Sequence, residues 1–349
     1  MSVLVDLLLE KKRNKEQEIS IYFFEHCNLR CSFCWQDHES SVGLNTVREK
    51  VSSIEEYFKE EPRHEITFAM MGGELFDDSI FDQKLLDDFK FVTKSVYELS
   101  IKYNKTVKIN WITNLITGKI DQIKDLLNYG RSFGMPVKLY TSYDFRGRFN
   151  VNQFMIFKKT VDILWDEIEG FSLTMTRSNC QYFVDKKDSY FDYIYDRGGY
   201  IHFDYYMPDE SADQQCPSDS LMYEVFKKVA KEYPNIDPIK SWIRNRENTA
   251  SCRSSKMINS HNQRSNCGAF VIDQNEKSAD KVYEIKLHRK SNLGIENHFL
   301  EKYNCVSCDY LERCSFSCFM LHASTRFVDE LDDCVYRKTF KFLEDEKII

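Results

Sequence analysis

The stretch that decides the fold is His26-Cys27-Asn28-Leu29-Arg30-Cys31-Ser32-Phe33-Cys34-Trp35, which follows the apolar run Ile19–Phe24. Its cysteines have the spacing CX3CX2C, and an aromatic residue directly precedes the third cysteine. Three thiolates this close together can bind three irons of a 4Fe–4S cluster and leave the fourth iron open to an outside ligand. A zinc ion would normally need a fourth protein ligand, which His26 or His38 could supply.

Short apolar runs alternate with longer helical patterns from residue 19 to residue 208. The apolar runs are rich in β-branched and aromatic residues, which favour strands, and they are Ile19–Phe24, Ile66–Met71, Val107–Thr113, Val137–Ser142, Phe171–Thr176 and Tyr200–Tyr205. The helical patterns are Thr46–Glu60, Ser79–Tyr103, Lys119–Ser132, Gln153–Glu169 and Gln181–Asp196. Because parallel strands need crossover connections, these β-then-α steps predict an α/β fold, a partial (β/α)6 barrel of the TIM type. A doubly wound open sheet would give the same alternation.

The alternation stops after Pro208, and three parts of the chain are predicted from this change. Residues 1–208 form the barrel, residues 209–251 form a bridging segment with one helix at Asp219–Tyr233, and residues 252–349 form a small cysteine-rich domain with a C-terminal helix. The region from Cys252 to Cys334 has few helix signals and many cysteines. We therefore expect bound metal to hold this domain together.

The composition of the 349-residue chain is that of a globular protein, since 42% of its residues are hydrophobic. A net charge of −7 provides no broad basic surface for nucleic acid or an anionic membrane. No apolar run approaches the roughly 18 residues of a membrane span, and Val3–Leu9 is too short for a signal peptide. We expect a cytoplasmic protein, in which the clustered cysteines, ten of the twelve in the chain, bind metal rather than form disulfides.

The first cysteine cluster resembles the signature of the radical S-adenosylmethionine (SAM) enzymes. Cys27, Cys31 and Cys34 carry the resemblance, at the end of a first strand. It implies that these cysteines bind a 4Fe–4S cluster whose open iron binds SAM. In that family the reduced cluster cleaves SAM to methionine and a deoxyadenosyl radical, which abstracts a hydrogen atom from the substrate. The resemblance also implies that Phe33 lies near the adenine.

Three later segments resemble motifs of the same family in the same order. Gly72-Gly73-Glu74 follows the second strand, where the family has a GGE motif that contacts the SAM amino group, although Leu75 stands where proline often follows. Glycines let the backbone approach a ligand closely, and a carboxylate suits an ammonium group. Thr113-Asn114 resembles a TNG segment, and Ser142 with Asp144 resembles an SxD pair that binds the ribose hydroxyls. Each segment also fits polar residues at a strand end that bind no ligand.

The C-terminal cysteines, in the pattern CX2CX5CX3C followed by a distant cysteine, resemble the SPASM domain, which carries two auxiliary iron–sulfur clusters. Cys252-X14-Cys267 matches the earlier portion of that domain, and the residues between them can form a short hairpin. The implied ligands of the outer cluster are Cys305, Cys308, Cys314 and Cys334, and those of the inner cluster are Cys252, Cys267 and Cys318. A zinc ribbon or treble-clef module is the alternative for this region.

The inner cluster departs from the family pattern. Arg246 stands where relatives have a further cysteine, and arginine is a poor iron ligand because it does not readily lose a proton. Either Cys216, in a polar loop, supplies the fourth ligand, or the cluster keeps an open iron that could bind substrate. A smaller cluster, or none, is a third interpretation. Cys180 fits a small core residue better than a reactive thiol.

No motif assigns a catalytic residue, and the candidates are His202, Asp204 and Cys216. His202 and Asp204 alternate with apolar residues on the sixth predicted strand, so both would point into the barrel. There they could contact the substrate or satisfy each other. Three arginines follow predicted strands and could hold a carboxylate, namely Arg146, Arg148 and Arg177.

The predicted function is hydrogen abstraction by a SAM-derived radical, with crosslinking or oxidation of a ribosomally made peptide or protein as the expected outcome. Only 26 residues precede Cys27, so the peptide would be recognised by the barrel face or by a separate leader-binding protein, and a one-electron reductant such as flavodoxin or ferredoxin would supply electrons. Gly268 stands where anaerobic sulfatase-maturating enzymes have an aspartate base, which argues against that activity. The alternatives are a sugar or alcohol dehydrogenase or epimerase, and a non-catalytic iron–sulfur or zinc module.

Overall fold

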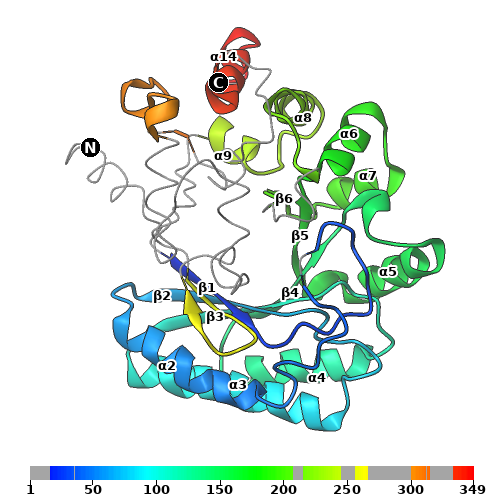
Figure 1. Cartoon of the computed structure of the whole chain (residues 1–349), viewed down its shortest axis with the longest axis vertical. Helices are drawn as coiled ribbons and strands as arrows, with labels where there is room; N and C mark the ends of the chain where they lie inside the picture. Colours follow the sequence, from blue (N-terminus) through cyan, green and yellow to red (C-terminus); the bar gives the residue numbers. More distant parts are fainter. Residues whose placement is uncertain are drawn as a thin grey trace.

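The described part of the chain forms an eight-stranded sheet that curls into a half-barrel (Figure 1). The computed structural model describes residues 16–34, 36–206, 215–244, 256–265, 300–311, 313–314 and 333–349. The strand order is β6-β5-β4-β3-β2-β1-β7-β8, and every neighbouring pair is parallel except β7 and β8. The predicted partial barrel of six parallel strands is therefore confirmed.

The strand bounds agree closely with the predicted apolar runs. The strands are β1 (Glu16–Tyr22), β2 (Glu65–Met71), β3 (Thr106–Ile112), β4 (Val137–Ser142), β5 (Ile168–Thr174), β6 (Ile201–Asp204), β7 (Lys256–Ile258) and β8 (Arg264–Ser265). The helices are α2 (Lys50–Glu60), α3 (Gln83–Lys102), α4 (Ile120–Arg131), α5 (Val151–Leu164), α6 (Arg177–Asp185), α7 (Ser189–Asp196), α8 (Asp219–Glu232), α9 (Ile239–Ile243) and α14 (Val335–Asp345). Within the described ranges, no helix has both the length and the apolar character that crossing a membrane requires.

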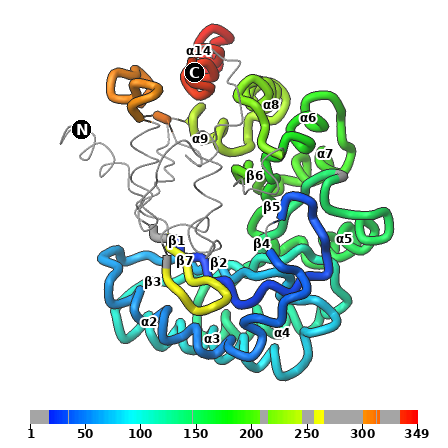
Figure 2. Tube along the Cα trace, in the orientation of Figure 1, coloured from blue at the N-terminus to red at the C-terminus, as the bar shows by residue number. Residues whose placement is uncertain are grey.

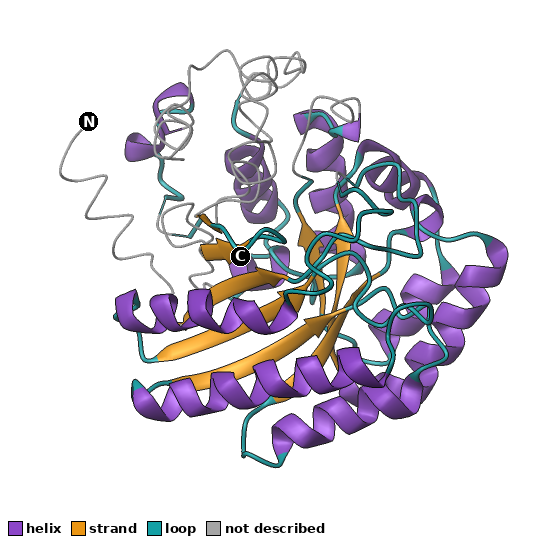
Figure 3. Ribbon diagram, turned by 60° about the horizontal axis from the view of Figure 1, so that its bottom comes forward, coloured by secondary structure: helices purple, strands orange, loops and turns teal. Residues whose placement is uncertain are grey.

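The two faces of the sheet differ in polarity, as β4 illustrates. Val137 and Leu139 are buried on the outer face, whereas Lys138, Tyr140 and Ser142 alternate with them and are only partly buried. Figure 3 shows the long helices along the convex side of the sheet. Burial of the outer face stabilises the fold by about 25 cal/mol per Å² of apolar surface. The polar inner face is left for the site.

The core under the first three strands is aromatic. Phe89 of α3 lies with its ring centroid 4.9 Å from that of Trp111 of β3 and 5.3 Å from that of Phe23. Phe76 packs edge-on against Phe89 at 6.3 Å. All four rings are completely buried, and each contributes roughly 1.5–3 kcal/mol by leaving water. This core holds the ends of β1 and β3 in fixed relative positions.

Two predicted helices differ from the structure. The predicted helix Gln181–Asp196 is two helices, because Asp188 caps a new start and accepts hydrogen bonds from the backbone N–H groups of Tyr190 and Phe191. The predicted helix Gln153–Glu169 ends earlier, since α5 stops at Leu164 and Ile168 already begins β5. In both regions tertiary pairing or capping overrides the periodicity of the sequence.

The predicted bridging segment and C-terminal part are tied to their neighbours by packing. The ring centroid of Trp242 in α9 lies 5.0 Å from that of Phe340 in α14. The ring centroid of Phe226 in α8 lies 6.2 Å from that of Tyr336 in α14. The hairpin of β7 and β8, predicted from the sequence between Cys252 and Cys267, is confirmed. Its first strand pairs with β1 and so extends the barrel sheet (Figure 2). The division of the chain at residues 208 and 251 stays a prediction.

Buried side chains of α2 hold this hairpin in place. Lys50 is fully buried, and its Nζ donates hydrogen bonds to the carbonyl oxygens of Asn259 at 2.5 Å and Ser260 at 3.0 Å. Tyr57, two turns later, donates its hydroxyl to the carbonyl of Met257 at 2.8 Å. Burial lowers the pKa of Lys50 to about 8. The lysine is therefore a structural donor whose charge is costly to bury.

Replacing Lys50 by methionine is expected to lower the free energy of unfolding by about 1–3 kcal/mol, because two buried carbonyls lose their donor. The difference in the free energy of unfolding between the parent and Lys50→Met should increase from pH 8 to pH 10.5. In that window the unfolded lysine binds more protons than the folded one, so the parent gains stability as the pH rises. Urea unfolding at several pH values measures both effects. The control is Lys59→Met, which alters an exposed lysine of the same helix; identical pH profiles for parent and Lys50→Met would contradict the prediction.

Candidate functional site

The residues predicted to bind the cluster and SAM lie along one edge of the barrel. Parallel strands bring their carboxyl ends to the same edge, and each predicted motif ends a strand or follows one. In chain order these motifs are the first cysteine cluster after β1, Gly72-Gly73-Glu74 after β2, Thr113-Asn114 after β3, and Ser142 and Asp144 at and after the end of β4. The structure therefore brings together residues that are up to 117 positions apart in the sequence.

The loop of the first three cysteines is held by its own backbone and by the loop after β3. The backbone N–H of Cys27 donates to the carbonyl of His38 at 3.1 Å, and that of Cys34 donates to the carbonyl of Cys31 at 3.0 Å. The Sγ atom of Cys27 accepts the N–H of Leu29 at 3.4 Å and the Nδ2 of Asn114 at 3.9 Å. Such N–H donors stabilise a sulfur that carries negative charge.

Burial controls the acidity of these thiols. Cys27 and Cys31 are buried, and Cys34 is half-buried. Burial raises the pKa of Cys27 to about 12, with a further contribution from the nearby carboxyl of Glu74. Burial also raises the pKa of Cys31, while the positive charge of Arg148 opposes this. Binding of a metal group here would have to displace the thiol protons.

His26, a possible fourth ligand of a zinc ion in the sequence analysis, is engaged elsewhere. Its Nε2 lies 3.1 Å from the carboxylate of Asp77 and 3.4 Å from the hydroxyl of Ser79. His38 contributes its backbone carbonyl to the cysteine loop, and burial lowers the pKa of its side chain. Among the residues that the structure describes, no three His, Cys, Asp or Glu side chains are arranged to hold a single metal ion.

The two glycines of the GGE segment allow a close approach between two backbone segments. A Cβ atom on Gly73 would lie 1.9 Å from the carbonyl oxygen of His26, and one on Gly72 would lie 2.6 Å from that of Phe24. The N–H of Gly73 donates to the carbonyl of Phe24 at 2.8 Å, and the N–H of Glu74 donates to that of His26 at 2.7 Å. The small size of both glycines lets the loop after β2 lie against the start of the cysteine loop, and their contact with SAM stays a prediction.

Glu74 joins the ends of β2 and β3. Its side chain is completely buried and accepts hydrogen bonds from the Thr113 hydroxyl at 2.6 Å, the Asn114 N–H at 2.6 Å and the Phe76 N–H at 3.0 Å. Burial raises the pKa of Glu74 to about 7, and these three donors oppose the rise. Oε1 accepts two of these hydrogen bonds and Oε2 accepts one, and contact with a SAM ammonium stays a prediction.

Asp144 and Arg148 form a buried ion pair beside the first cysteines. Asp144 is completely buried, and both Nε and Nη2 of Arg148 lie 2.6 Å from its Oδ2. Its Oδ1 accepts the N–H of Thr174 at 2.6 Å and the Nδ2 of Asn179 at 3.3 Å. Ribose binding by Asp144 stays a prediction, and in the described arrangement its carboxylate orients Arg148.

Arg148 and Phe33 lie together. The Arg148 guanidinium is 5.7 Å from the centroid of the Phe33 ring, and its positive charge opposes the rise that burial causes in the pKa of Cys31. The other member of the predicted SxD pair, Ser142, has its hydroxyl 2.7 Å from that of Ser172 on β5. Ser142 is partly exposed on the inner face, whereas Phe33 is largely buried.

His202 and Asp204 both lie on the inner face of β6, as predicted. The Nδ1 of His202 lies 3.4 Å from the hydroxyl of Tyr140 on β4. Its surroundings exclude water and lower its pKa, whereas they raise the pKa of Asp204, even though part of Asp204 remains exposed.

Cys216 is placed differently from the expectation. The sequence analysis put it in a polar loop, but its side chain is completely buried in the hydrophobic core just before α8. Its carbonyl accepts the Nε of Arg177 at 3.1 Å. The prediction for Cys180 is confirmed, since it is a buried core residue of α6 whose pKa is raised by burial. The side chain of Arg146 lies outside the described residues.

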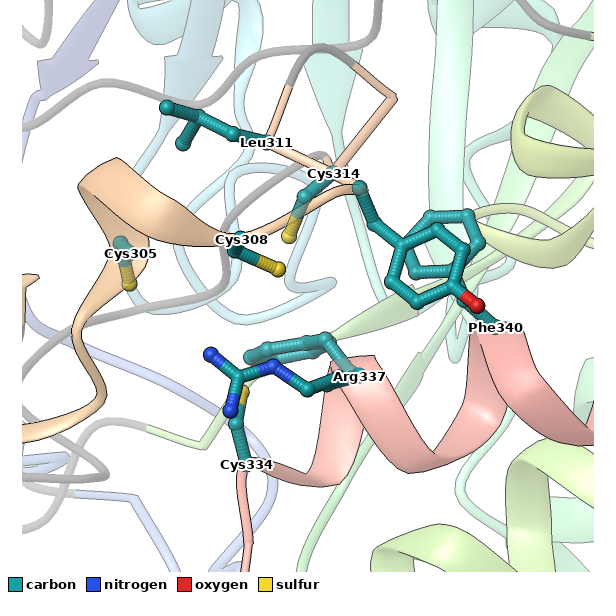
Figure 4. Close-up of a pocket in the computed structure, with 9 residues that line it drawn as sticks. Cys305, Cys308, Leu311, Cys314, Cys334, Arg337 and Phe340 are labelled. Carbon is teal, nitrogen blue, oxygen red and sulfur yellow. The ribbon is translucent and has the colours of Figure 1, made fainter.

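Four C-terminal cysteines converge on one cavity (Figure 4). Cys305 begins the short 3-10 helix η5 (Cys305–Ser307), and Cys308 is the residue that ends it. Cys314 lies six residues further along the chain, and Cys334 is the N-cap residue of α14. These are the four residues predicted to hold the outer auxiliary cluster. Cys252, Cys267 and Cys318, predicted for the inner cluster, lie outside the described residues, as do Arg246 and Gly268.

Comparison with solved structures relates this fold to known ones. The structure of hexahistidine-tagged anSMEcpe with bound AdoMet, an anaerobic sulfatase-maturating radical SAM enzyme, matches with a TM-score of 0.61 at 13% sequence identity, covering 95% of this chain and 98% of that chain. The chain shares the fold of anSMEcpe. Streptococcus suis SuiB also matches, with a TM-score of 0.37 at 15% identity over 91% of this chain and 77% of that chain.

A second structure of Streptococcus suis SuiB, bound to precursor peptide SuiA, matches with a TM-score of 0.39 at 16% identity, covering 95% of this chain and 78% of that chain. No protein-family model matches the chain. No curated protein matches it in sequence.

Two polar side chains that contact predicted site residues were not predicted from the sequence. Asn179 of α6 donates a hydrogen bond to the carboxylate of Asp144, and no sequence motif indicates this contact. Arg337 enters the cavity of the four C-terminal cysteines. Its spacing of three residues from Cys334 was a usable signal, because residues i and i+3 of a helix lie on one face. The partner of Asn179 could not be predicted, since it depends on how α6 packs against β4.

Proposed function

We propose that the chain is a radical SAM enzyme that binds a 4Fe–4S cluster through Cys27, Cys31 and Cys34. The observation that carries the proposal is the position of the CX3CX2C loop at the carboxyl end of β1, within a fold shared with AdoMet-bound anSMEcpe. Three thiols suit a cluster with one open iron, and the neighbouring His26 is engaged by Asp77.

The surroundings of these cysteines fit a negatively charged cluster. Cys27 accepts two N–H donors, and Arg148 places a positive charge beside Cys31. When bound, the cluster and SAM supply the deoxyadenosyl radical that abstracts hydrogen from the substrate. The protein supplies orientation: Asp144 holds Arg148, Glu74 fixes the ends of β2 and β3, and Asn114 reaches the sulfur of Cys27.

We further propose that Cys305, Cys308, Cys314 and Cys334 hold an outer auxiliary cluster, as in a SPASM domain. Their convergence on one cavity supports this assignment. The inner cluster, with Cys252, Cys267 and Cys318, is proposed from the sequence resemblance alone. Cys216 is buried, as are Cys27, Cys31, Cys305, Cys314 and Cys334, so its burial does not decide between a fourth cysteine ligand and an inner cluster with three cysteines.

The proposed substrate is a peptide or protein that is crosslinked or oxidised, which rests on the sequence resemblance. His202 and Asp204 are the proposed substrate contacts, because they face the polar interior of the half-barrel and have shifted pKa values. Gly268, in place of an aspartate, separates the chain from sulfatase maturation. A flavodoxin or ferredoxin is the proposed reductant.

The proposal is tested by anaerobic reconstitution followed by metal and product analysis. Three clusters of the 4Fe type would bind about twelve irons per chain. The reduced protein is expected to convert SAM to deoxyadenosine and methionine, measured by chromatography. Stoichiometric zinc with almost no iron, and no deoxyadenosine, would instead support a zinc-binding module.

A further inference from the structure

One positive side chain of the described chain lines the cavity of the four C-terminal cysteines, and it is paired with a carboxylate that does not line the cavity. Among the described residues that line it, Arg337 is the one with a charged side chain, and no carboxylate faces it. Figure 4 shows the guanidinium group lying among the cysteines, between Cys308 and Cys334 in this view. A group with net negative charge would be stabilised at this position.

Arg337 is held rigidly in this position. Its Nη1 lies 2.7 Å from the carboxylate of Asp333, and its Nη2 donates to the carbonyl of Tyr303 at 2.8 Å. It also donates a side-chain hydrogen bond to Cys308. The contacts with Asp333 and Tyr303 therefore fix the orientation of the guanidinium group, and a third contact is made with the sulfur of Cys308.

Cys334 lies at the start of a helix. It is the N-cap of α14, whose first turn includes Tyr336 and Arg337. The first turn of a helix carries unpaired N–H groups and the positive end of the helix dipole. Arg337 and the start of α14 thus direct both charge and N–H donors to two cysteines on the same side of the cavity.

We infer that Arg337 raises the reduction potential of an iron–sulfur cluster bound by Cys305, Cys308, Cys314 and Cys334, so that this site takes up an electron more readily. The inference rests on the proposed outer cluster. One-electron reduction adds a negative charge to the cluster, and a fixed cation with N–H···S hydrogen bonds stabilises the reduced form more than the oxidised form. Arg337 is therefore a positioning residue for charge and provides no iron ligand.

The test is a redox titration of the full-length, reconstituted protein followed by electron paramagnetic resonance. The outer-cluster signal is identified as the one lost in Cys305→Ala/Cys308→Ala. In Arg337→Gln, which keeps an N–H donor but removes the charge, the equilibrium constant for reduction should fall about tenfold, or about 59 mV for one electron. Arg337→Lys keeps the positive charge, so the reduction potential should fall less than in Arg337→Gln. Lys347→Gln, at an exposed lysine just beyond the end of α14, is the matched control and should leave the potential unchanged.

The outcomes separate this inference from the proposal beneath it. An unchanged potential in Arg337→Gln, with the outer-cluster signal intact, overturns the role of Arg337. Loss of outer-cluster iron in both Arg337 variants also overturns it, because Arg337 would then act in assembly of the site. If Cys305→Ala/Cys308→Ala retains all the iron and signals of the parent, the outer cluster itself is wrongly assigned.

Discussion

Replacement of Cys27, Cys31 and Cys34 together by alanine is expected to reduce SAM cleavage to the background of the assay. These three residues supply every proposed protein ligand of the first cluster, and alanine offers no donor atom. The measurement is the amount of deoxyadenosine formed per chain by the reduced, reconstituted protein. Iron content should also fall by about four atoms per chain, since the auxiliary sites are untouched.

The matched control for the triple variant is Cys180→Ala. Cys180 is a buried cysteine of α6 that belongs to the core, and it is assigned to no cluster. This variant should keep both its iron content and its SAM cleavage. If the triple variant cleaved SAM as fast as the parent, the first cysteine cluster would not be the site of this chemistry.

Asp144→Ala is expected to destabilise the fold by about 3–5 kcal/mol, because it leaves the largely buried guanidinium of Arg148 without its counter-ion. The side chains of Asp144 and Arg148 are 0% and 16% exposed, so solvent screens the pair weakly. The backbone N–H of Thr174 and the amide of Asn179 lose their acceptor as well. Urea unfolding at pH 7, followed by circular dichroism, measures the loss.

An exposed ion pair provides the comparison for Asp144. Asp162 lies 3.4 Å from Arg197, and its side chain is 53% exposed, so Asp162→Ala should cost about 1 kcal/mol or less. Equal stability of Asp144→Ala and the parent would show that the buried pair contributes nothing. Asp144 would then be available for the ribose contact that its sequence position predicts.

The sequence analysis predicted the barrel well because the pattern of each strand is local. In β4 the predicted and observed bounds coincide, since alternating apolar residues and flanking polar segments define a strand without reference to the rest of the chain. The errors occurred where distant groups intervene, as at Asp188, which starts a new helix within one periodic pattern. The burial of Cys216 was not predicted for the same reason, because it depends on distant residues such as Arg177 of α6, which donates to its carbonyl.

By itself, the sequence determined the spacing of the three N-terminal cysteines and their position after a strand, because both are properties of contiguous residues. It also determined that the predicted motifs would share one edge of the sheet, since parallel strands leave no other arrangement for their carboxyl ends. Only the tertiary structure decided what those motifs contact. Gly73 lies against the backbone of His26, Asp144 holds Arg148 and meets Asn179 from another helix, and Arg337 enters a cavity of four cysteines. Such partners depend on the packing of segments far apart in the chain, which local spacing does not encode.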